Sequence, residues 1–202
     1  WTTMPKQEIM KLRTSQDEEV RMALLLAIHC APILSGSKAA NIMTVTVHEF
    51  DRIGYLLQGT GIRYRFLKTK GDKGILYLYR EKRLRQYLEQ EEIQEFLSEY
   101  GYDEVNIAKM LNLLSKRIRM YNDQEAVFPH EIGVFLEYPL GDVKGFLANE
   151  GKNFMYSGYW KVYQDLQGAV RRFTQYDMER ELTIQALMQG KTIREIALAA
   201  AC

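Results

Sequence analysis

Two of the three histidines in this chain are candidates for catalytic or metal chemistry. The first is His29, which is followed by Cys30. An imidazole next to a thiol could contribute a nucleophile or a pair of metal ligands. Adjacent residues on a helix point roughly 100° apart, so both side chains would need partners from elsewhere in the fold. The alternative is that Cys30 is a small, buried and inert core residue.

The second histidine of this kind is His130, which stands between Pro129 and Glu131. Proline suits the first turn of a helix, and the positive end of a helix lowers the pKa of a nearby imidazole. His130 would then be neutral and able to act as a base or a ligand. Metal-binding helices repeat the ligand four residues later, where this chain has Val134, so no metal site is predicted. The alternative is that His130 bonds locally and Glu131 favours the helix dipole.

A third group that could bind a ligand is the segment Ser35-Gly36-Ser37-Lys38, which is followed closely by Asn41. Small residues with a lysine can form a nest of backbone N–H groups that binds an anion. The spacing of a phosphate-binding P-loop is absent, and no strand leads into the segment. An ordinary loop between a helix and a strand is therefore the favoured interpretation.

Aromatic residues surround Lys161 in a segment that has the pattern of a strand. Alternation places Tyr159, Lys161 and Tyr163 on one face and Trp160 on the other. We expect Trp160 to lie in the core. The Tyr-Lys-Tyr face could form a wall against a planar ligand, because aromatic rings and a cation both bind flat π-systems.

Residues 129–150 have the spacing of a helix-turn-helix motif, with a proline and a glycine between two short apolar segments. Glu137 occupies the place where the turn glycine is usual. A DNA-reading helix needs donors for phosphates and base edges, whereas this one carries Asp142 and is followed by Glu150. The pattern favours a corner of two helices that serves packing.

The hydrophobic pattern predicts an α+β fold, with a small mixed β-sheet of about four strands flanked by many helices. The predicted strands are residues 42–47, 62–69, 75–79 and 159–163. A helix over residues 48–58 follows the first strand, which gives a β-α-β-β core plus a late strand. The other predicted helices cover residues 6–30, 81–88, 91–100, 103–121 and 165–188.

The end of the chain is expected to be a separate element. Thr192 and Glu195 have the spacing of a capping box for a last helix. We expect residues 1–190 to form one domain and residues 191–202 a C-terminal helical tail. With 202 residues, of which 47% are hydrophobic, the chain is long enough to bury a substantial core.

Charge and cysteine content restrict the function. A formal net charge of +1 does not favour nucleic acid, a membrane surface or an acidic substrate as a partner. Cys30 and Cys202 form no C-x-x-C motif, which favours a reducing, cytoplasmic location. No apolar run approaches the ~18 residues of a membrane span. Trp1 at the start would fit a fragment or a processed chain, and no signal peptide is visible.

Two sequence strings are specific enough to suggest a family. They are F-P-H-E-I-G at residues 128–133 and G-Y-W-K-V-Y at residues 158–163, and with them the chain resembles the bacterial domain-of-unknown-function family 3793. The resemblance spans most of residues 24–190. Its further matches are His29-Cys30-Ala31-Pro32, Gly36, Lys38, Asn41, residues 76–80, the rest of 128–138, residues 142–146 and Asp165.

The resemblance implies a redox or metal-homeostasis context and supplies no reaction. Members of that family often carry one cysteine just before the second string and another in the following helix. Here these places hold Ser157 and Glu179, so a cysteine metal site is not expected in this chain.

We therefore predict a cytoplasmic protein that binds a small molecule or a protein partner, with the cofactor left open. One alternative is an enzyme that uses His130 as base and Cys30 as nucleophile. The other is a DNA-binding regulator through residues 129–150. The predicted binding site comprises His29, Cys30, Lys38, Asn41, His130, Glu131, Tyr159, Lys161 and Tyr163.

Overall fold

The computed structural model describes residues 6–122 and 128–199; Trp1 and Cys202 lie outside this part of the chain. The chain divides into two compact units, which are described separately. The first comprises Trp1–Arg80 with Gln175–Cys202, and the second comprises Glu81–Thr174. The domain boundary expected at residue 190 stays a prediction. None of the described helices combines the length and apolar character needed to cross a membrane.

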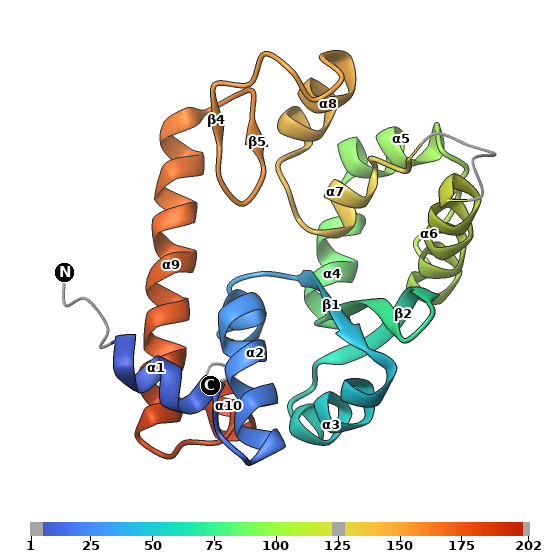
Figure 1. Ribbon diagram of the computed structural model, residues 1–202. Helices are drawn as coiled ribbons and strands as arrows, with labels where there is room; N and C mark the ends of the chain where they lie inside the picture. The colour runs from blue at the N-terminus through green and yellow to red at the C-terminus, as the bar shows by residue number, and fades with distance from the viewer. Residues whose placement is uncertain (1–5, 123–127, 200–202) are drawn as a thin grey trace. The chain divides into compact units, whose positions relative to one another are not determined.

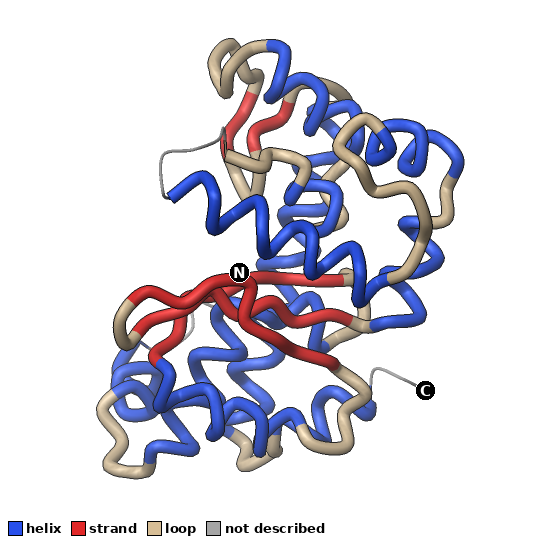
Figure 2. Tube along the Cα trace, turned by 90° about the vertical axis from the view of Figure 1, so that its right-hand side faces the viewer, coloured by secondary structure: helices blue, strands red, loops and turns tan. Residues whose placement is uncertain are grey.

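The first unit is built on a three-stranded antiparallel sheet with the strand order β1-β3-β2 (Figure 2). The strands are β1 (Ala40–Thr46), β2 (Arg63–Lys70) and β3 (Lys73–Tyr79). Helix α3 (Val47–Leu57) connects β1 to β2, which confirms the predicted β-α-β-β order. Strand β3 is central, and its consecutive residues Leu76, Tyr77 and Leu78 are all buried, which explains its apolar sequence because both of its faces are covered.

The core of the first unit lies between the sheet and its helices. Helix α2 (Glu18–Leu34) contributes Leu26 and Cys30, and β3 contributes Leu76 and Leu78 to the same buried cluster. The N-terminal helix α1 (Lys6–Arg13) packs on α2. The end of α2 lies four residues beyond the predicted end at residue 30. Pro32 lacks only its own N–H, and the next turn still closes because Ser35 N–H donates to the Ala31 carbonyl at 2.8 Å.

Helix α10 (Ile193–Ala199) also belongs to this core. Its predicted capping box is confirmed: Glu195 N–H donates to Thr192 Oγ1 at 3.2 Å, and Thr192 N–H donates to the Glu195 carboxylate at 2.8 Å. Ile193 and Ala197 are buried in the cluster formed with α2 and α3. The segment predicted as a tail is therefore packed against the helices of the first unit.

The second unit is mainly helical (Figure 1). The long helix α9 (Leu166–Met188) begins in this unit and ends in the first one. Its other elements are α4 (Glu81–Leu88), α5 (Glu91–Ser98), α6 (Ile107–Asn122), α7 (Ile132–Phe135), α8 (Leu140–Ala148), β4 (Tyr156–Ser157) and β5 (Lys161–Val162).

The α+β class is confirmed, but the place of the late strand was predicted wrongly. Strand β5 pairs only with β4 in a two-stranded antiparallel hairpin, and the described strands include no parallel pair that would make a mixed sheet. The reversal at Gly158 explains the error. A Cβ atom there would lie 2.4 Å from the Phe173 ring, so only glycine lets the hairpin approach α9 this closely.

Candidate functional site

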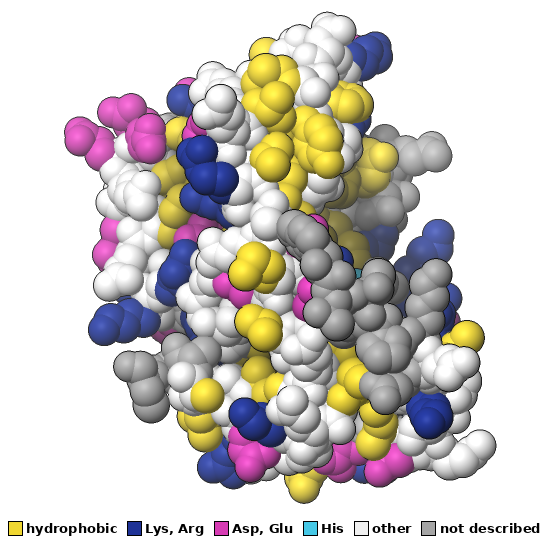
Figure 3. All heavy atoms as spheres, turned by 90° about the vertical axis from the view of Figure 1, so that its left-hand side faces the viewer, with side chains coloured by type: hydrophobic (Ala, Val, Ile, Leu, Met, Phe, Trp, Pro, Cys, Tyr) yellow, Lys and Arg dark blue, Asp and Glu magenta, His cyan; other side chains and the backbone are white. Residues whose placement is uncertain are grey.

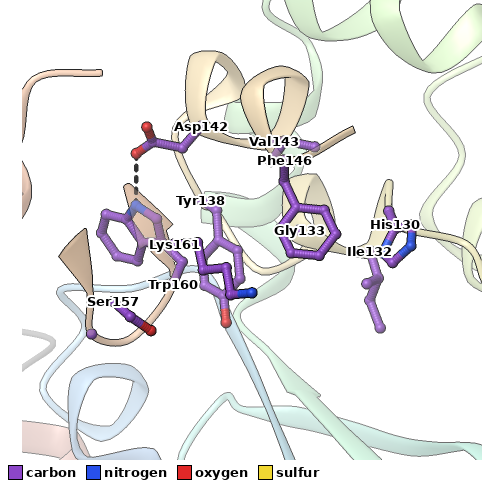
Figure 4. Close-up of a pocket in the computed structure, with 11 residues that line it drawn as sticks. His130, Ile132, Gly133, Tyr138, Asp142, Val143, Phe146, Ser157, Trp160 and Lys161 are labelled. Atoms are coloured by element: carbon purple, nitrogen blue, oxygen red, sulfur yellow. Dashed lines mark hydrogen bonds between the residues drawn. The ribbon is translucent and has the colours of Figure 1, made fainter. Parts of the chain in front are cut away.

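The second unit contains a cavity of about 310 Å³ between the helices α7 and α8 and the β4–β5 hairpin (Figure 4). This volume lies at the lower end of the range found for small-molecule sites. Two of the predicted site residues, His130 and Lys161, line it together. The lining residues are His130, Ile132, Gly133, Tyr138, Asp142, Val143, Phe146, Ser157, Gly158, Trp160 and Lys161.

Close packing of α7 on α8 forms one side of the cavity. A Cβ atom at Gly133 would lie 2.9 Å from a methyl group of Val143, so the helices meet at a position where only a hydrogen fits. The turn between them passes through Glu137, whose φ of 57° is in the left-handed region. The Glu137 carboxylate accepts from Arg83 at 2.8 Å, which helps to hold this strained turn. The helical corner predicted from the sequence is therefore real and rigid.

Asp142 joins the second side of the cavity to the first. Its carboxylate accepts from the Trp160 indole N–H at 2.7 Å (Figure 4) and from the backbone N–H groups of Tyr163 and Gln164 at 2.7 and 2.9 Å. Only 3% of the Asp142 side chain is exposed. Three donors on one buried carboxylate fix the hairpin against α8. Asp142 is therefore satisfied within the protein.

The same contacts weaken the hypothesis of a DNA-binding regulator. Helix α7 has only four residues, which is about one turn. In α8, Asp142 and Val143 are buried against other parts of this unit. A reading helix would have to present such residues to a DNA groove.

Lys161 supplies the positive charge of the cavity. Its Nζ donates to the Gly151 carbonyl at 2.6 Å and lies 5.5 and 4.8 Å from the ring centres of Phe146 and Phe154. Both distances are within the reach of cation–π attraction. Among the described residues, Lys161 makes no ion pair with a carboxylate. The charge of Lys161 is therefore stabilised by the Gly151 carbonyl and by the rings of Phe146 and Phe154.

His130 lies on the other side of Phe146 from Lys161 (Figure 4). Its ring centre is 5.0 Å from that of Phe128 and 4.8 Å from that of Phe146. Burial lowers the pKa of His130 below its ordinary value of 6.5, and the Glu131 carboxylate opposes this change more weakly. The predicted direction is confirmed, but the predicted cause was the end of a helix. Helix α7 begins only at Ile132 and is too short for a strong dipole.

Glu131 has a different role from the one predicted. It is fully buried, and its Oε1 accepts from Arg117 Nε at 2.5 Å and from the Tyr102 hydroxyl at 3.2 Å. Its other carboxylate oxygen has no hydrogen-bond partner within the described residues. Glu131 therefore attaches the turn before α7 to α6 and is absent from the cavity lining.

The predicted alternation of the aromatic segment agrees with burial, since Trp160 and Val162 are buried whereas Tyr159, Lys161 and Tyr163 are partly exposed. Trp160 is 7% exposed, as expected for a core residue, yet its ring also lines the cavity. Tyr159 packs on Phe173 with ring centres 5.5 Å apart. Tyr163 and Tyr159 do not line the cavity, so Lys161 alone of the Tyr-Lys-Tyr set faces it.

The hairpin also has an outer face that is hydrophobic. Figure 3 shows apolar side chains gathered over the β4–β5 hairpin and the start of α9. The exposed fractions of Phe154, Met155 and Tyr156 are 41, 52 and 48%. Each of the two strands has only two residues, so the hairpin depends on its inner contacts to Asp142 and Phe173 rather than on its own ladder.

The remaining predicted residues form a cluster inside the first unit. Lys38 Nζ donates to Asn41 Oδ1 at 3.4 Å, and the Asn41 amide donates to the His29 carbonyl and lies 4.0 Å from Cys30 Sγ. The Cys30 thiol donates to the sulfur of Met43 at 3.7 Å. His29 joins only through its backbone, since its side chain is exposed. Whether this cluster and the cavity bind one ligand stays a prediction.

The environment of Cys30 does not suit a nucleophile. The thiol is fully buried, and burial raises its pKa to about 12 despite the opposing effects of Lys38 and Asn41. A catalytic thiol needs the opposite shift. The nearby loop is closed as well, because the Ser37 hydroxyl donates to the Glu179 carboxylate at 2.6 Å. A carboxylate at this position opposes anion binding by a nest and agrees with the ordinary loop favoured by the sequence.

Sequence reasoning missed the lining residues that come from α8 and β4. Phe146 and Ser157 stood within or beside recognised strings, but nothing local indicated that they face His130. Within the described residues, no group of three or more His, Cys, Asp or Glu side chains could hold a metal ion.

Comparison with known proteins gives a family and no further relative. The chain matches the family described as "Protein of unknown function (DUF3793)" over residues 26–197. No curated protein and no solved structure is significantly similar to it. The match covers both cavity-forming strings and the Cys30 cluster. The chain is therefore a member of the DUF3793 family.

Proposed function

We propose that this protein is a small-molecule-binding protein and that the cavity in the second unit is its binding site. The observation that supports this proposal is the character of the cavity. It is lined mainly by aliphatic and aromatic side chains, and its described polar groups include the Lys161 ammonium, the His130 imidazole, the Asp142 carboxylate and the hydroxyls of Tyr138 and Ser157. An apolar wall with a few polar groups is typical of ligand sites.

The cavity is also pre-formed. Asp142 fixes the hairpin, Glu131 fixes the turn that carries His130, and the Gly133–Val143 contact fixes the two helices. A site held in this way loses little conformational entropy when a ligand binds. The cytoplasmic location and the redox or metal-homeostasis context remain predictions from the sequence and the family resemblance.

Binding rather than catalysis is the function that these contacts favour. Among the described lining residues the one carboxylate is that of Asp142, which is engaged by three donors and is not available as a base. The thiol proposed as nucleophile is buried and protonated. His130 would have to act alone in acid–base chemistry, which usually needs a second group within hydrogen-bond reach.

The test is a titration of the isotopically labelled protein with one- and two-ring aromatic fragments, followed by amide chemical shifts. About thirteen non-hydrogen atoms at about 0.3 kcal/mol each give a dissociation constant near 1 mM, which this method detects. We expect the shifts to centre on residues 130–146 and 157–161. The proposal fails if no fragment moves these resonances.

A matched pair of variants locates the binding. Ser157→Phe places a ring at the mouth of the cavity and should abolish the shifts, since Ser157 lines the cavity but is exposed. Gln167→Phe adds the same ring at an exposed position of α9 outside the lining and should leave binding unchanged. Equal loss in both variants would contradict the assignment.

A further inference from the structure

The charges around the cavity carry information about its ligand. Two charged side chains line it, Asp142 and Lys161. The carboxylate of Asp142 keeps its charge, but both of its oxygens are already engaged by the indole N–H and two backbone N–H groups, all within 2.9 Å. Among the described residues, the hydrogen-bond acceptor of Lys161 is the Gly151 carbonyl, which uses one of its N–H groups. Lys161 is therefore the charged group of the lining that can still form hydrogen bonds with a ligand.

The polar groups around the cavity are also mainly donors. An ammonium group has three N–H bonds, and the contact with Gly151 uses one of them. His130 is uncharged at neutral pH because burial lowers its pKa, so one ring nitrogen still carries a proton. Within the described residues no hydrogen bond engages the His130 ring or the Ser157 hydroxyl. A ligand with acceptor oxygens would complement these groups.

The shape and surface of the cavity restrict the remainder of the ligand. Phe146 lies between His130 and Lys161 (Figure 4), and Tyr138 and Trp160 form a second aromatic surface with ring centres 5.3 Å apart. Aromatic walls favour a flat, apolar body. At ~30 Å³ per water molecule, a volume of 310 Å³ corresponds to about ten waters, which suits one or two fused rings.

These three observations distinguish between kinds of anion. A phosphate monoester carries nearly two charges and is usually bound by arginine, a helix N-terminus or a nest of backbone N–H groups. The lining includes one lysine and no arginine. One ammonium group matches the single charge of a carboxylate.

Resting on the proposed function, we infer that the ligand of this cavity is an aromatic monocarboxylate of one or two rings, whose carboxylate is bound by Lys161. The ring lies against Phe146, Tyr138 and Trp160. His130 lies on the other side of Phe146 from Lys161, so it is placed to donate to a ring substituent rather than to the carboxylate, and Ser157 adds a hydroxyl donor to the lining. Lys161 is then the residue that determines the preference for an anion.

The experiment compares naphthalene-2-carboxylate with its neutral amide, naphthalene-2-carboxamide, by calorimetry or chemical-shift titration on the full chain. We expect the carboxylate to bind roughly tenfold more tightly, as a charge-assisted hydrogen bond to an ammonium group provides. In Lys161→Gln this ratio should fall to about one while the amide still binds. Lys161→Arg should keep most of the preference.

Lys144→Met is the control, because Lys144 is an exposed lysine of α8 that does not line the cavity, and it should keep the full ratio. If both probes bind equally well and Lys161→Gln changes nothing, the inference is wrong and the binding function stands. If neither probe binds, both are wrong. Should Lys161→Gln fail to fold, the ratio is measured on the unaltered protein in rising salt, where a salt-independent ratio would overturn the inference.

Discussion

The polar cluster around Cys30 in the first unit and the cavity in the second unit each contain a lysine. The surroundings of the two lysines differ. In the first unit Lys38 is 3% exposed, bonds to Asn41 and lies 5.8 Å from the Tyr176 ring centre. In the second unit Lys161 also lies over aromatic rings, but it faces a cavity. The comparison shows that the same pairing of lysine and aromatic ring can close a core or prepare a binding site. What differs is whether the surrounding groups are already satisfied.

The largest expected effect concerns the polar cluster of the first unit and is the chemical reactivity of the Cys30 thiol. A pKa of about 12 leaves about one Cys30 in ten thousand as thiolate at pH 8, against about one in ten at the ordinary value of 9.0. We therefore expect iodoacetamide to alkylate Cys30 about a thousandfold more slowly in the folded protein than in urea. Mass mapping of the Cys30 peptide measures the rate. A folded rate within tenfold of the unfolded one would show that the cluster is open.

The second prediction concerns the carboxylate that holds the cavity together. Asp142→Ala removes the acceptor of three buried donors and should lower the free energy of unfolding by about 3 kcal/mol. Asp142→Asn keeps one acceptor oxygen and should cost about half as much. Urea unfolding measures both. Asp103→Ala, at an exposed aspartate of the same unit, is the control and should stay within about 0.5 kcal/mol of the unaltered protein.

Asp142 also illustrates how much of the structure could be predicted from the sequence. The helix that contains it and the strand that contains Trp160 were both expected near their observed positions, because hydrophobic periodicity and glycine or proline punctuation act locally. Their joining was not expected, since a contact across 18 residues leaves no local pattern. The β4–β5 hairpin was not predicted for the same reason. Strands of two residues are too short for alternation to reveal, and the ring that requires glycine at position 158 belongs to Phe173, which is on another element.

Some residues of the candidate site could be chosen from the sequence, whereas the roles of others could not. His130 and Lys161 could be chosen by residue type, and both line the cavity. Glu131 could be chosen too, but its partner Arg117 is on a separate helix, so its structural role was hidden. Cys30 was named both as a ligand and as a core residue, and its burial favours the second interpretation.

The third prediction compares polar residues from the two places directly. Asn41→Leu removes the amide that connects Lys38, Cys30 and the His29 carbonyl, and should destabilise the fold by about 1 to 2 kcal/mol. Lys161→Gln should cost less, about 0.5 to 1 kcal/mol, since a partly exposed lysine loses one hydrogen bond to the Gly151 carbonyl and two cation–π contacts. The midpoints of urea unfolding of the two variants measure these changes in stability. The reverse order would mean that Lys161 is structural and that the cluster is the less important of the two for stability.

The smallest effect should come from pH, and it concerns the cavity, where burial lowers the pKa of His130. The folded pKa of His130 lies below its ordinary value of 6.5, so the unfolded chain binds the proton more readily. The stability contributed by neutral His130 is complete above pH 6.5 and is lost as the pH falls from there through the folded pKa. Burial is the larger cause and the Glu131 carboxylate opposes it, so the loss should stay below about 1 kcal/mol for this partly exposed ring. Unfolding of the unaltered protein and of His130→Gln at pH 8 and pH 5 measures the difference, with the other titrating groups common to both proteins. An identical pH dependence in the two proteins would mean that the His130 ring is as solvated in the folded protein as in the unfolded chain, and the lowered pKa assigned to it would then be wrong.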